Sequence, residues 1–374
     1  MTQRKGKQRR GAGRLAALTL ALALALSLCP HALAAEDALS AAARRAADQL
    51  VQTVPAPQVG AVGGEWAVIG LARGGFEVPW HYWEDYYAAV TAQVKACGGV
   101  LHPRKYTEYS RVILALTAIG ADPRDVAGYD LLVPLGDFER TIAQGVNGAA
   151  FALLALDAGE YEIPRNPAAA TQATRQMYVD TILARQLPDG GWNLTGGDGA
   201  EADTTAMALQ ALAGYRKQAA VSAAVDRGLA CLSGLQGLDG GFDAYGSQNT
   251  ESIAQVVVAL CQLGIPLEDA RFVKNGATLV QRLLAAQLPN GSFCHQAEDA
   301  AGDLMATEQA LYALAAVLRS ASGRPALYCM GDAEPLLSGG TEPFPKSPEM
   351  SREILSRRAC AKMLGAALLC VRLL

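Results

Sequence analysis

A seven-residue motif that recurs three times constrains the fold of this chain more than any other feature. It reads Gln-Leu-Pro-Asp-Gly-Gly-Trp from Gln186, Gln-Gly-Leu-Asp-Gly-Gly-Phe from Gln236, and Gln-Leu-Pro-Asn-Gly-Ser-Phe from Gln287. The copies start 50 and then 51 residues apart. A fixed period of this length is typical of repeat architectures, in which each repeat is one supersecondary unit.

Each copy of the motif follows one helical pattern and precedes another. The Asp-Gly or Asn-Gly pair supplies the positive φ that a sharp reversal needs. The aromatic residue at the end is interpreted as packing the turn onto neighbouring helices. The structural turn positions are Gln186, Asp189, Gly190, Trp192, Gln236, Asp239, Gly240, Phe242, Gln287, Gly291 and Phe293.

The second helix of each unit is apolar on nearly every side, which predicts a buried position. These helices end in Ala-Leu, at Leu116, Leu156, Leu212, Leu260 and Leu314, and residues 66–72 suit a sixth unit. The first helices carry charges such as Arg185 and Arg282, which predicts that they lie outside. The sequence therefore predicts an all-α fold without strands: an α/α toroid of five or six helical hairpins with inner and outer rings.

The first 34 residues have the pattern of a signal peptide. Six basic residues precede an apolar run from Leu15 to Leu28, and Ala32-Leu33-Ala34 fits a cleavage site. An uncleaved membrane anchor is the weaker alternative, because the run is shorter than the ~20 residues of a membrane span. A lipoprotein attached through Cys29 is weaker still, because Leu28 stands where a small residue is needed. We expect an exported protein, secreted or at the cell surface.

The repeats stop near residue 325. Residues 326–358 are rich in Pro and Gly and predict a linker. Residues 359–374 form an apolar segment that is short for a membrane span. Weak membrane contact and a last amphipathic helix on the ring both remain open for it. The predicted order is signal peptide 1–34, toroid 38–325, linker 326–358 and apolar segment 359–374.

Charge and cysteine content exclude two classes of protein. Removing the six basic residues of the signal peptide from 32 Lys and Arg leaves 26, against 36 Asp and Glu. Such a chain lacks the basic stripe that nucleic-acid binding requires, so no nucleic-acid partner is expected. The seven cysteines that remain are odd in number and irregularly spaced. They are interpreted as small core residues rather than a disulfide framework.

The repeat resembles that of the terpene-cyclase and protein-prenyltransferase superfamily. The resemblance rests on Gln-x-x-Asp-Gly-Gly-Trp followed by residues 203–209, on residues 306–311 in the last copy, and covers about 60–325. It implies an α/α toroid whose inner helices line a central cavity. Residues 107–132 are most similar to secreted bacterial proteins of this kind, which are related to the toroid of the vitamin B12 carriers. The fold hosts unrelated activities, so the resemblance by itself implies no function.

The catalytic motifs of these relatives are missing. Triterpene cyclases supply a strong acid with Asp-x-Asp-Asp, and diphosphate-ionising enzymes hold magnesium with Asp-Asp-x-x-Asp. The acidic stretches 198–203 and 298–303 have neither spacing. The Asp-x-Cys of zinc-dependent prenyltransferases is absent, and Cys294-His295 lacks further ligands in a known context. We therefore predict no metal and no cofactor.

One end of the ring is expected to carry a collar of aromatic and acidic residues that faces a ligand. The candidate ligand-binding residues are Trp80, Trp83, Tyr86, Tyr106, Glu108, Tyr109, Asp203, Glu251 and Glu308. In the structural alternative the carboxylates complement helix dipoles. The neighbouring Thr107, Thr204, Thr250 and Thr307 would then cap free N–H groups, and the aromatic residues would pack the core.

Together these features favour a non-catalytic module that binds a ligand or a partner through a central apolar cavity. The ligand would be an unknown small molecule or lipid, with a corrinoid or an isoprenoid as candidates, and a cell-surface protein would be a second kind of partner. The alternative is a terpenoid cyclase or prenyltransferase-like enzyme with an isoprenoid substrate. A glycan-active enzyme is a third reading, which would need a carboxylate pair across the cavity.

Overall fold

The computed structural model describes residues 37–197, 199–244 and 246–336. The chain divides into two compact units, one of Met1–Ala41 with Thr341–Leu374 and one of Ala42–Gly340. The repeats lie in the second unit. The predicted signal peptide, most of the predicted linker 326–358 and the apolar segment 359–374 lie outside the described residues.

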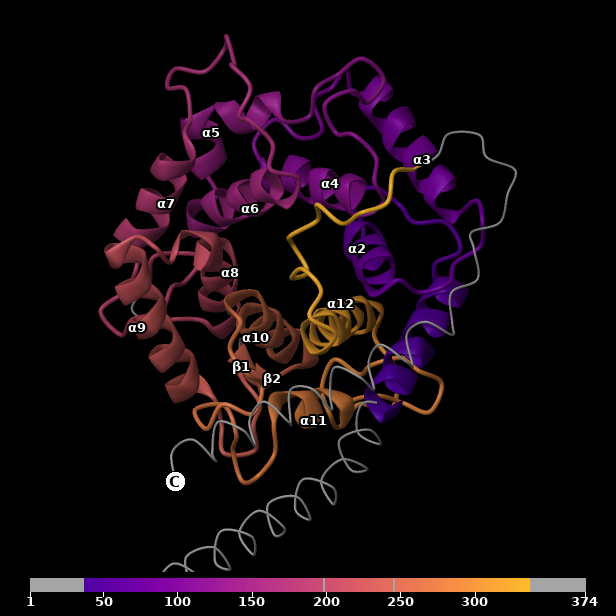
Figure 1. Ribbon diagram of the computed structural model, residues 1–374, viewed down its shortest axis with the longest axis vertical. Helices are drawn as coiled ribbons and strands as arrows, with labels where there is room; N and C mark the ends of the chain where they lie inside the picture. The colour runs from indigo at the N-terminus through magenta and orange to yellow at the C-terminus, as the bar shows by residue number, and fades with distance from the viewer. Residues whose placement is uncertain (1–36, 198, 245, 337–374) are drawn as a thin grey trace, which may run out of the picture. The chain divides into compact units, whose positions relative to one another are not determined.

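The second unit has two concentric rings of helices (Figure 1). Within the described residues, the inner helices are α2 (Glu65–Gly74), α4 (Thr107–Ala118), α6 (Gly145–Ala158), α8 (Ala202–Leu212), α10 (Thr250–Leu263) and α12 (Leu304–Ala321). The outer helical segments are residues 42–53, α3 (Tyr82–Ala96), α5 (Phe138–Ile142), α7 (Arg175–Ala184), α9 (Ala219–Leu235) and α11 (Leu279–Leu284). The predicted all-α toroid is confirmed, with six helical hairpins in this part of the chain.

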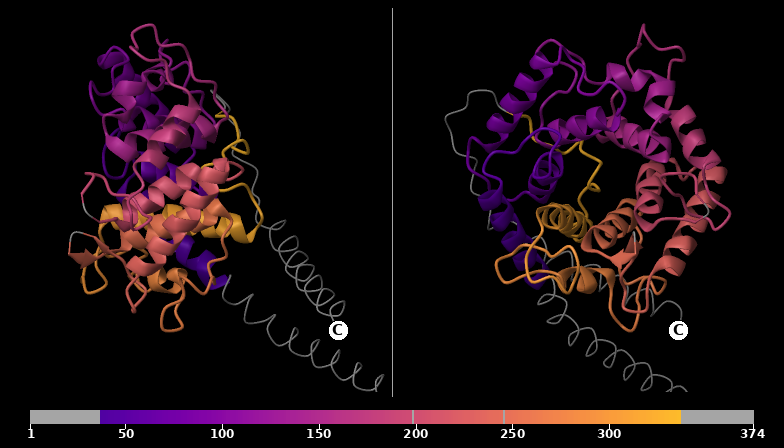
Figure 2. Two further views of the ribbon diagram at one scale, coloured as in Figure 1. Left: turned by 90° about the vertical axis from the view of Figure 1, so that its left-hand side faces the viewer. Right: turned by 180° about the vertical axis from the view of Figure 1, so that it is seen from behind.

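The ring is closed by the first and last inner helices. Each inner helix packs against the next, and α12 packs against α2. The two helices approach closely at Gly70, where a Cβ would come within 3.2 Å of the Tyr312 nitrogen. The view from behind in Figure 2 shows the same closed ring of inner helices. Residues far apart in the sequence therefore meet at one seam.

The expectation that no strands are present is wrong in one place. Asp243–Ala244 (β1) and Ser247–Gln248 (β2) pair antiparallel, with Asp243 opposite Gln248 and Ala244 opposite Ser247. This short hairpin lies in the loop that leads into α10. Two 3-10 turns, η1 (Val133–Gly136) and η2 (Ala213–Tyr215), complete the described elements. Two-residue strands leave no alternating pattern in a sequence, so periodicity could not reveal them.

The glutamine of each repeat motif joins its own turn to the following repeat. The Gln186 amide donates to the carbonyls of Gly190 at 2.7 Å and Ala224 at 2.8 Å. Gln236 makes the equivalent pair with Gly240 and Phe272. Gln287 bonds to Gly291 and to the Ala42 carbonyl of the first outer helix. The last of these clamps joins the end of the repeat array back to its beginning.

The other motif residues hold the turn itself. The carboxyl group of Asp189 accepts a hydrogen bond from the Gly191 nitrogen at 3.1 Å, and Asp239 bonds Gly241 in the same way. Gly190 has a φ of 92°, in the left-handed region. Trp192, Phe242 and Phe293 are fully buried, so each turn carries one aromatic residue into the layer between the two rings.

Changing Gly190 to Ala should destabilise the protein by more than 1 kcal/mol. A Cβ at this position would lie 2.8 Å from the Arg227 carbonyl oxygen, and the positive φ is strained for any residue with a Cβ. Gly234→Ala is the matched control. That glycine lies within α9 with open space around it, so we expect a gain of about 0.5–1 kcal/mol. Urea unfolding of both variants measures the difference, and equal effects would contradict the role of the turn.

Residues 325–336, which we call the closing segment, follow α12 and cross one end of the ring (Figures 1 and 2). The Met330 nitrogen donates to the Ala158 carbonyl at the end of α6, at 2.8 Å. The Leu336 nitrogen donates to the Gly120 carbonyl just after α4, at 3.1 Å. The chain therefore remains attached to the ring beyond residue 325, where the toroid was expected to end.

Candidate functional site

The inner helices are largely buried, but each has part-exposed side chains within its first two turns. We call eight of these the lumen residues: Trp66, Glu108, Arg111, Asn147, Asp203, Met207, Gln255 and Gln309. A side chain on a helix with neighbours on both sides and behind it reaches water only toward the ring axis or at a rim. Most of the lumen residues are polar.

An aromatic and amide cluster occupies the interior of the ring. Trp66 packs against Phe151 of α6 at 5.7 Å and against Tyr312 of α12 at 5.9 Å, measured between ring centroids. The Gln255 amide donates to the Tyr312 hydroxyl at 2.5 Å, and that hydroxyl donates to Gln309 at 3.0 Å. Since α2 and α6 are not neighbours in the ring, Trp66 must reach across its interior.

Two buried carboxyl groups meet at the seam between α12 and α2. Glu308 is 1% exposed, and its Oε2 accepts a hydrogen bond from the Gly63 nitrogen at 2.7 Å. Glu65 is fully buried, and its Oε1 accepts from the Gly60 nitrogen at 2.8 Å. The loop before α2 thus donates one backbone N–H to each carboxyl group, from Gly60 to Glu65 and from Gly63 to Glu308.

Tyr86, Glu108 and Arg111 complete this acidic cluster. Arg111 forms an ion pair with Glu108, one turn earlier on α4. Its charge also acts on both Glu65 and Glu308, as their pKa shifts show. The buried Tyr86 hydroxyl lies beside Glu65, and burial together with the Glu65 charge raises the pKa of Tyr86.

The environment of the cluster favours the protonated form of Glu308. Burial raises the pKa of Glu308 to about 8, and the Glu65 charge contributes to the increase. The Gly63 hydrogen bond and Arg111 act in the opposite direction. Burial likewise raises the pKa of Glu65. A carboxylic acid therefore holds its proton at neutral pH at the seam between α12 and α2.

A second group of titratable residues lies on α8 and α10. The carboxyl group of Glu251 accepts from His295 Nδ1 at 2.9 Å; this contact raises the pKa of His295, while burial raises that of Glu251. Asp203 is largely buried, its Oδ1 has no hydrogen-bond partner among the described residues, and burial raises its pKa. Asp203 and Glu251 therefore lie on neighbouring inner helices, and His295 lies in the loop before α12.

The predicted acidic collar is only partly assembled. Glu108 and Glu308 belong to one cluster, whereas Asp203 and Glu251 lie on neighbouring inner helices. Thr205 and Thr307 occupy equivalent positions, because each hydroxyl accepts from the motif aromatic, Trp192 or Phe293, at 2.9 Å. Asp203 lies two residues before Thr205, whereas Glu308 lies one residue after Thr307. The two carboxyl groups therefore lie at different heights along their helices.

The threonines do not cap the inner helices as expected. Asn249 caps α10 and Asp303 caps α12, each through its side-chain oxygen. The Thr250 hydroxyl donates to the Cys294 carbonyl, and Thr204 donates to Glu201. Thr107 and Thr250 are the first residues of α4 and α10, and Thr204 and Thr307 lie further inside α8 and α12. All four hydroxyl groups are therefore past the cap position.

The predicted aromatic residues divide between the cluster and ordinary packing. Tyr86 lies beside Glu65. Tyr106 and Tyr109 pack against each other edge to face, with centroids 5.3 Å apart. Trp83 packs against its neighbour Tyr82. Trp80 is 76% exposed in the turn before α3, next to His81. The structure brings only Tyr86 of these to the acidic cluster.

Sequence reasoning missed Glu65, Trp66, Arg111 and Tyr312 as candidate site residues. Glu65 opens an inner helix just as Glu108 does, but Gly63-Gly64 precedes it where Thr107 precedes Glu108. That shared first-turn position was the available signal. Tyr312 gave no such signal, because in a sequence an aromatic site residue within an apolar helix looks the same as a core residue.

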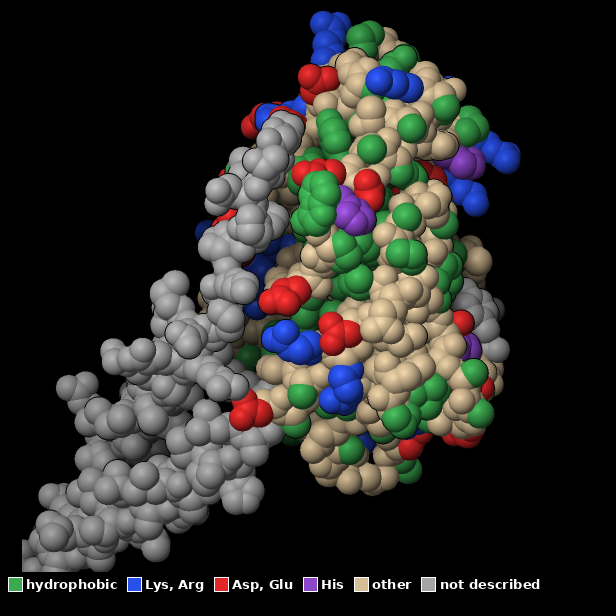
Figure 3. Space-filling model, turned by 90° about the vertical axis from the view of Figure 1, so that its right-hand side faces the viewer, with side chains coloured by type: hydrophobic (Ala, Val, Ile, Leu, Met, Phe, Trp, Pro, Cys, Tyr) green, Lys and Arg blue, Asp and Glu red, His purple; other side chains and the backbone are tan. Residues whose placement is uncertain are grey.

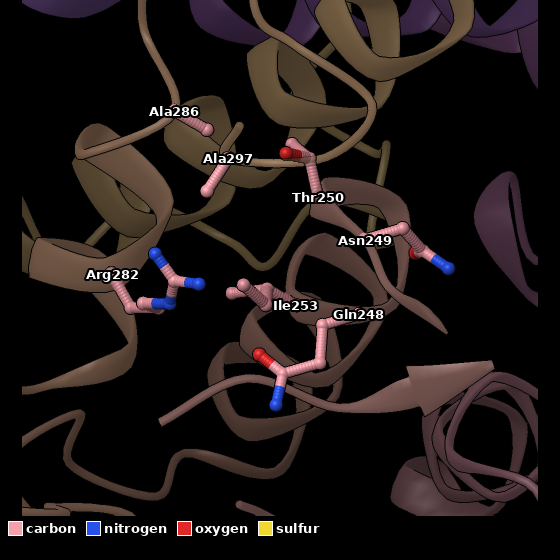
Figure 4. A pocket seen from close by; sticks show the side chains of 7 residues that line it. All are labelled: Gln248, Asn249, Thr250, Ile253, Arg282, Ala286 and Ala297. Carbon is pink, nitrogen blue, oxygen red and sulfur yellow. The ribbon is translucent and has the colours of Figure 1, made fainter. Parts of the chain in front are cut away.

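A small pocket lies near the start of α10. Figure 4 shows a pocket lined by Gln248, Asn249, Thr250, Ile253, Arg282, Ala286 and Ala297. Its volume is about 10 Å³, room for roughly one water molecule. It is therefore not the place for a substrate.

The described residues contain no candidate metal site and no candidate membrane span. No three of their His, Cys, Asp and Glu side chains are placed to hold a metal ion. None of their helices is both long and apolar enough to cross a bilayer. On the face shown in Figure 3, acidic and basic side chains are interspersed over the described part of the surface.

Comparison with solved structures identifies the fold. The chain is similar to ent-copalyl diphosphate synthase from Streptomyces platensis, with 24% identity over 68% of this chain and 49% of that one and a TM-score of 0.44. It is also similar to a variant of the type II terpene cyclase MstE from Scytonema in complex with geranylgeranyl dihydroxybenzoate, its substrate. That match has 18% identity, covers 76% of this chain and 98% of that one, and has a TM-score of 0.50.

The chain has an α/α-toroid fold, which it shares with the type II terpene cyclase MstE. It spans about half the length of the copalyl diphosphate synthase and nearly all of MstE. No family model and no curated protein matches the sequence.

The expectation of a non-catalytic module is corrected by these comparisons. The matched MstE structure is that of an enzyme with its substrate, and the terpenoid cyclase-like alternative fits this match better.

The raised pKa of Glu308 predicts how stability changes with pH. Below the ordinary glutamate pKa of 4.5 both the folded and the unfolded protein are protonated at this position. Between 4.5 and about 8 only the folded state keeps the proton, so stability falls with rising pH by about 1.4 kcal/mol per unit. Above about 8 this loss is complete.

Glu308→Gln isolates that contribution, because the amide stays neutral at every pH. We expect the wild-type protein to lose stability relative to the variant across this window. Urea unfolding of both proteins at several pH values measures it. A stability difference that is the same at all pH values would show that Glu308 has an ordinary pKa.

Proposed function

We propose that the chain is a terpenoid cyclase-like enzyme that acts on an oxygenated isoprenoid, with Glu308 as general acid. The observation that carries the proposal is the buried Glu308 carboxyl group, protonated at neutral pH beside Glu65. A general acid is most effective when its pKa lies near the working pH. The likeness to terpene cyclases supports the choice of reaction class.

The strength of this acid bears on the substrate. A carboxyl group with a pKa of about 8 is a weaker acid than an ordinary glutamic acid. Protonation of a plain alkene demands a strong acid, whereas an epoxide oxygen is far more basic. The amides of Gln255 and Gln309 lie beside Tyr312 and suit an oxygen-bearing group. We therefore expect an isoprenoid epoxide to react faster than the corresponding alkene.

The reaction follows from these positions. Glu308 gives its proton to the epoxide oxygen, the C–O bond breaks, and the electron pair of the nearest C=C bond forms the new C–C bond. The resulting cation loses a proton to water. The Gly63 N–H and the Arg111 charge stabilise the carboxylate that Glu308 becomes. Trp66 and Tyr312 present aromatic faces, which stabilise a nearby cation.

The test is product analysis with the chain from residue 35 onward. It is incubated separately with an isoprenoid epoxide, the parent alkene and an oligosaccharide, and products are separated by chromatography and weighed by mass spectrometry. A cyclised isomer of the epoxide, with the same mass, is the expected product. The absence of any isoprenoid product would contradict the proposal.

A second candidate is a glycan-active enzyme, favoured by the polar lumen wall. Asp203, Glu251 and Glu308 are carboxyl groups on neighbouring inner helices. Glycoside hydrolysis needs such a pair on either side of the bond to be cleaved. Cleavage of the oligosaccharide, without reaction of either isoprenoid, would favour this candidate.

A further inference from the structure

Two buried arginines meet where the first and the last inner helix end. Arg73 is in the last turn of α2 and Arg319 in the last turn of α12, and each side chain is 3% exposed. The Arg319 guanidinium donates to the Arg73 carbonyl across the seam, at 3.0 Å. The two helix ends therefore meet through two positively charged groups that water hardly reaches.

Both guanidinium groups stay charged at neutral pH. Burial and the Arg319 charge lower the pKa of Arg73, but an arginine in a protein does not lose its proton. Two like charges repel each other, and the repulsion grows as their surroundings become less polar. Without a carboxylate between them, Arg73 and Arg319 would push the ends of α2 and α12 apart.

Asp332 of the closing segment supplies that carboxylate. Its Oδ1 forms an ion pair with Arg73 at 2.7 Å, and its Oδ2 forms an ion pair with Arg319. Burial alone would raise the pKa of Asp332, but the hydrogen bonds from Arg319 and Arg73 lower it, so the group is charged at neutral pH. One carboxylate therefore bridges the first and the last inner helix.

The rest of the closing segment is bound by the same two arginines. Arg73 donates to the carbonyls of Leu327 and Cys329, both at 2.9 Å. Arg319 donates to the Pro325 carbonyl at 2.7 Å. Loss of the segment would leave both charges buried without a counter-charge, which is strongly destabilising.

We propose that the closing segment is a latch for the ring: α2 and α12 stay together while Asp332 is in place, and the seam opens when the segment leaves. Glu65 and Glu308 lie near the starts of the same two helices. Opening of the seam would therefore expose both carboxyl groups to water. The latch acts on the ring itself and is independent of the proposed reaction.

Hydrogen exchange tests the latch. In Asp332→Asn the amides of α2 and α12 should exchange at least about tenfold faster than in the wild-type protein, because two like charges then face each other at the seam. The amides of α6 and α8, which pack against neither α2 nor α12, should not change. Unchanged exchange in α2 and α12, or equal acceleration in all four helices, would overturn the latch.

A second variant separates charge repulsion from the simple loss of a contact. Asp332→Asn combined with Arg73→Gln also removes one of the two positive charges. If the carboxylate keeps like charges together, α2 and α12 should exchange more slowly in the double variant than in Asp332→Asn alone. Equal or faster exchange would contradict the latch. Should Asp332→Asn fail to fold, folding of the double variant would support the latch, and failure of both would count against it.

Asp269→Asn is the matched control for the change of residue type. Asp269 forms an ion pair with Arg271 at 2.8 Å, in the loop between α10 and α11. Because this pair connects two residues of one loop, its loss should leave exchange in α2 and α12 as it is in the wild-type protein. Acceleration equal to that in Asp332→Asn would show that the position of Asp332 at the seam does not matter.

Discussion

Replacing Glu308 with Gln should lower the rate of isoprenoid cyclisation by about 100- to 10,000-fold, the usual contribution of a general acid. The amide has the shape of the protonated carboxyl group but has no proton to give. Since Glu308 is already uncharged at neutral pH, the variant should fold as well as the wild-type protein. Product formation over time, with the isoprenoid epoxide as substrate, measures the effect.

The matched control is Glu298→Gln. Glu298 lies exposed in the loop before α12. The same chemical change at this position should leave the rate within a factor of about two, as expected for a surface substitution away from the site. Retention of full activity by Glu308→Gln would contradict its role, whatever the control shows.

Replacing Trp192 with Ala should cost about 3–5 kcal/mol of stability. Trp192 is fully buried, its indole nitrogen donates to the Ile182 carbonyl in α7 at 2.7 Å, and its ring lies against Gly228 of α9. The substitution leaves a cavity between two outer helices and an inner one. It also leaves the Ile182 carbonyl without this donor. Urea unfolding measures the loss.

Trp80→Ala provides the comparison for the same change of residue type. Trp80 is 76% exposed, so its truncation should alter stability by less than about 0.5 kcal/mol. A small effect at Trp192, or equal effects at the two tryptophans, would mean that the motif aromatic does not hold the repeat together.

The fold could be predicted because the same sequence motif occurs three times. Gln186, Gln236 and Gln287 perform the same task three times: the first two join their turns to the following repeat, and the third joins its turn to the first outer helix. Any one copy would have been a weak signal. Residues 66–72 carry no copy of the motif, so the sequence left the choice between five and six hairpins open.

The acidic cluster could be predicted only in part, because it forms where the ends of the repeat array meet. Gly63 and Glu308 are 245 positions apart in the sequence and 2.7 Å apart in the structure. No local pattern specifies which carboxyl groups share a seam. The closing segment posed a similar problem. Its prolines and glycines are typical of a linker, but Arg73, which is 254 positions before Leu327, helps to bind the segment to the ring.

The direct test of the central claim is an infrared measurement of the protonation state of Glu308. The carbonyl band of a protonated carboxylic acid is well separated from the bands of a carboxylate. The wild-type protein minus Glu308→Gln difference spectrum should show a protonated carbonyl at pH 7 that disappears with a pKa of about 8. A carboxylate band at pH 7, with no change between pH 6 and 9, would contradict the proposal that Glu308 is the acid.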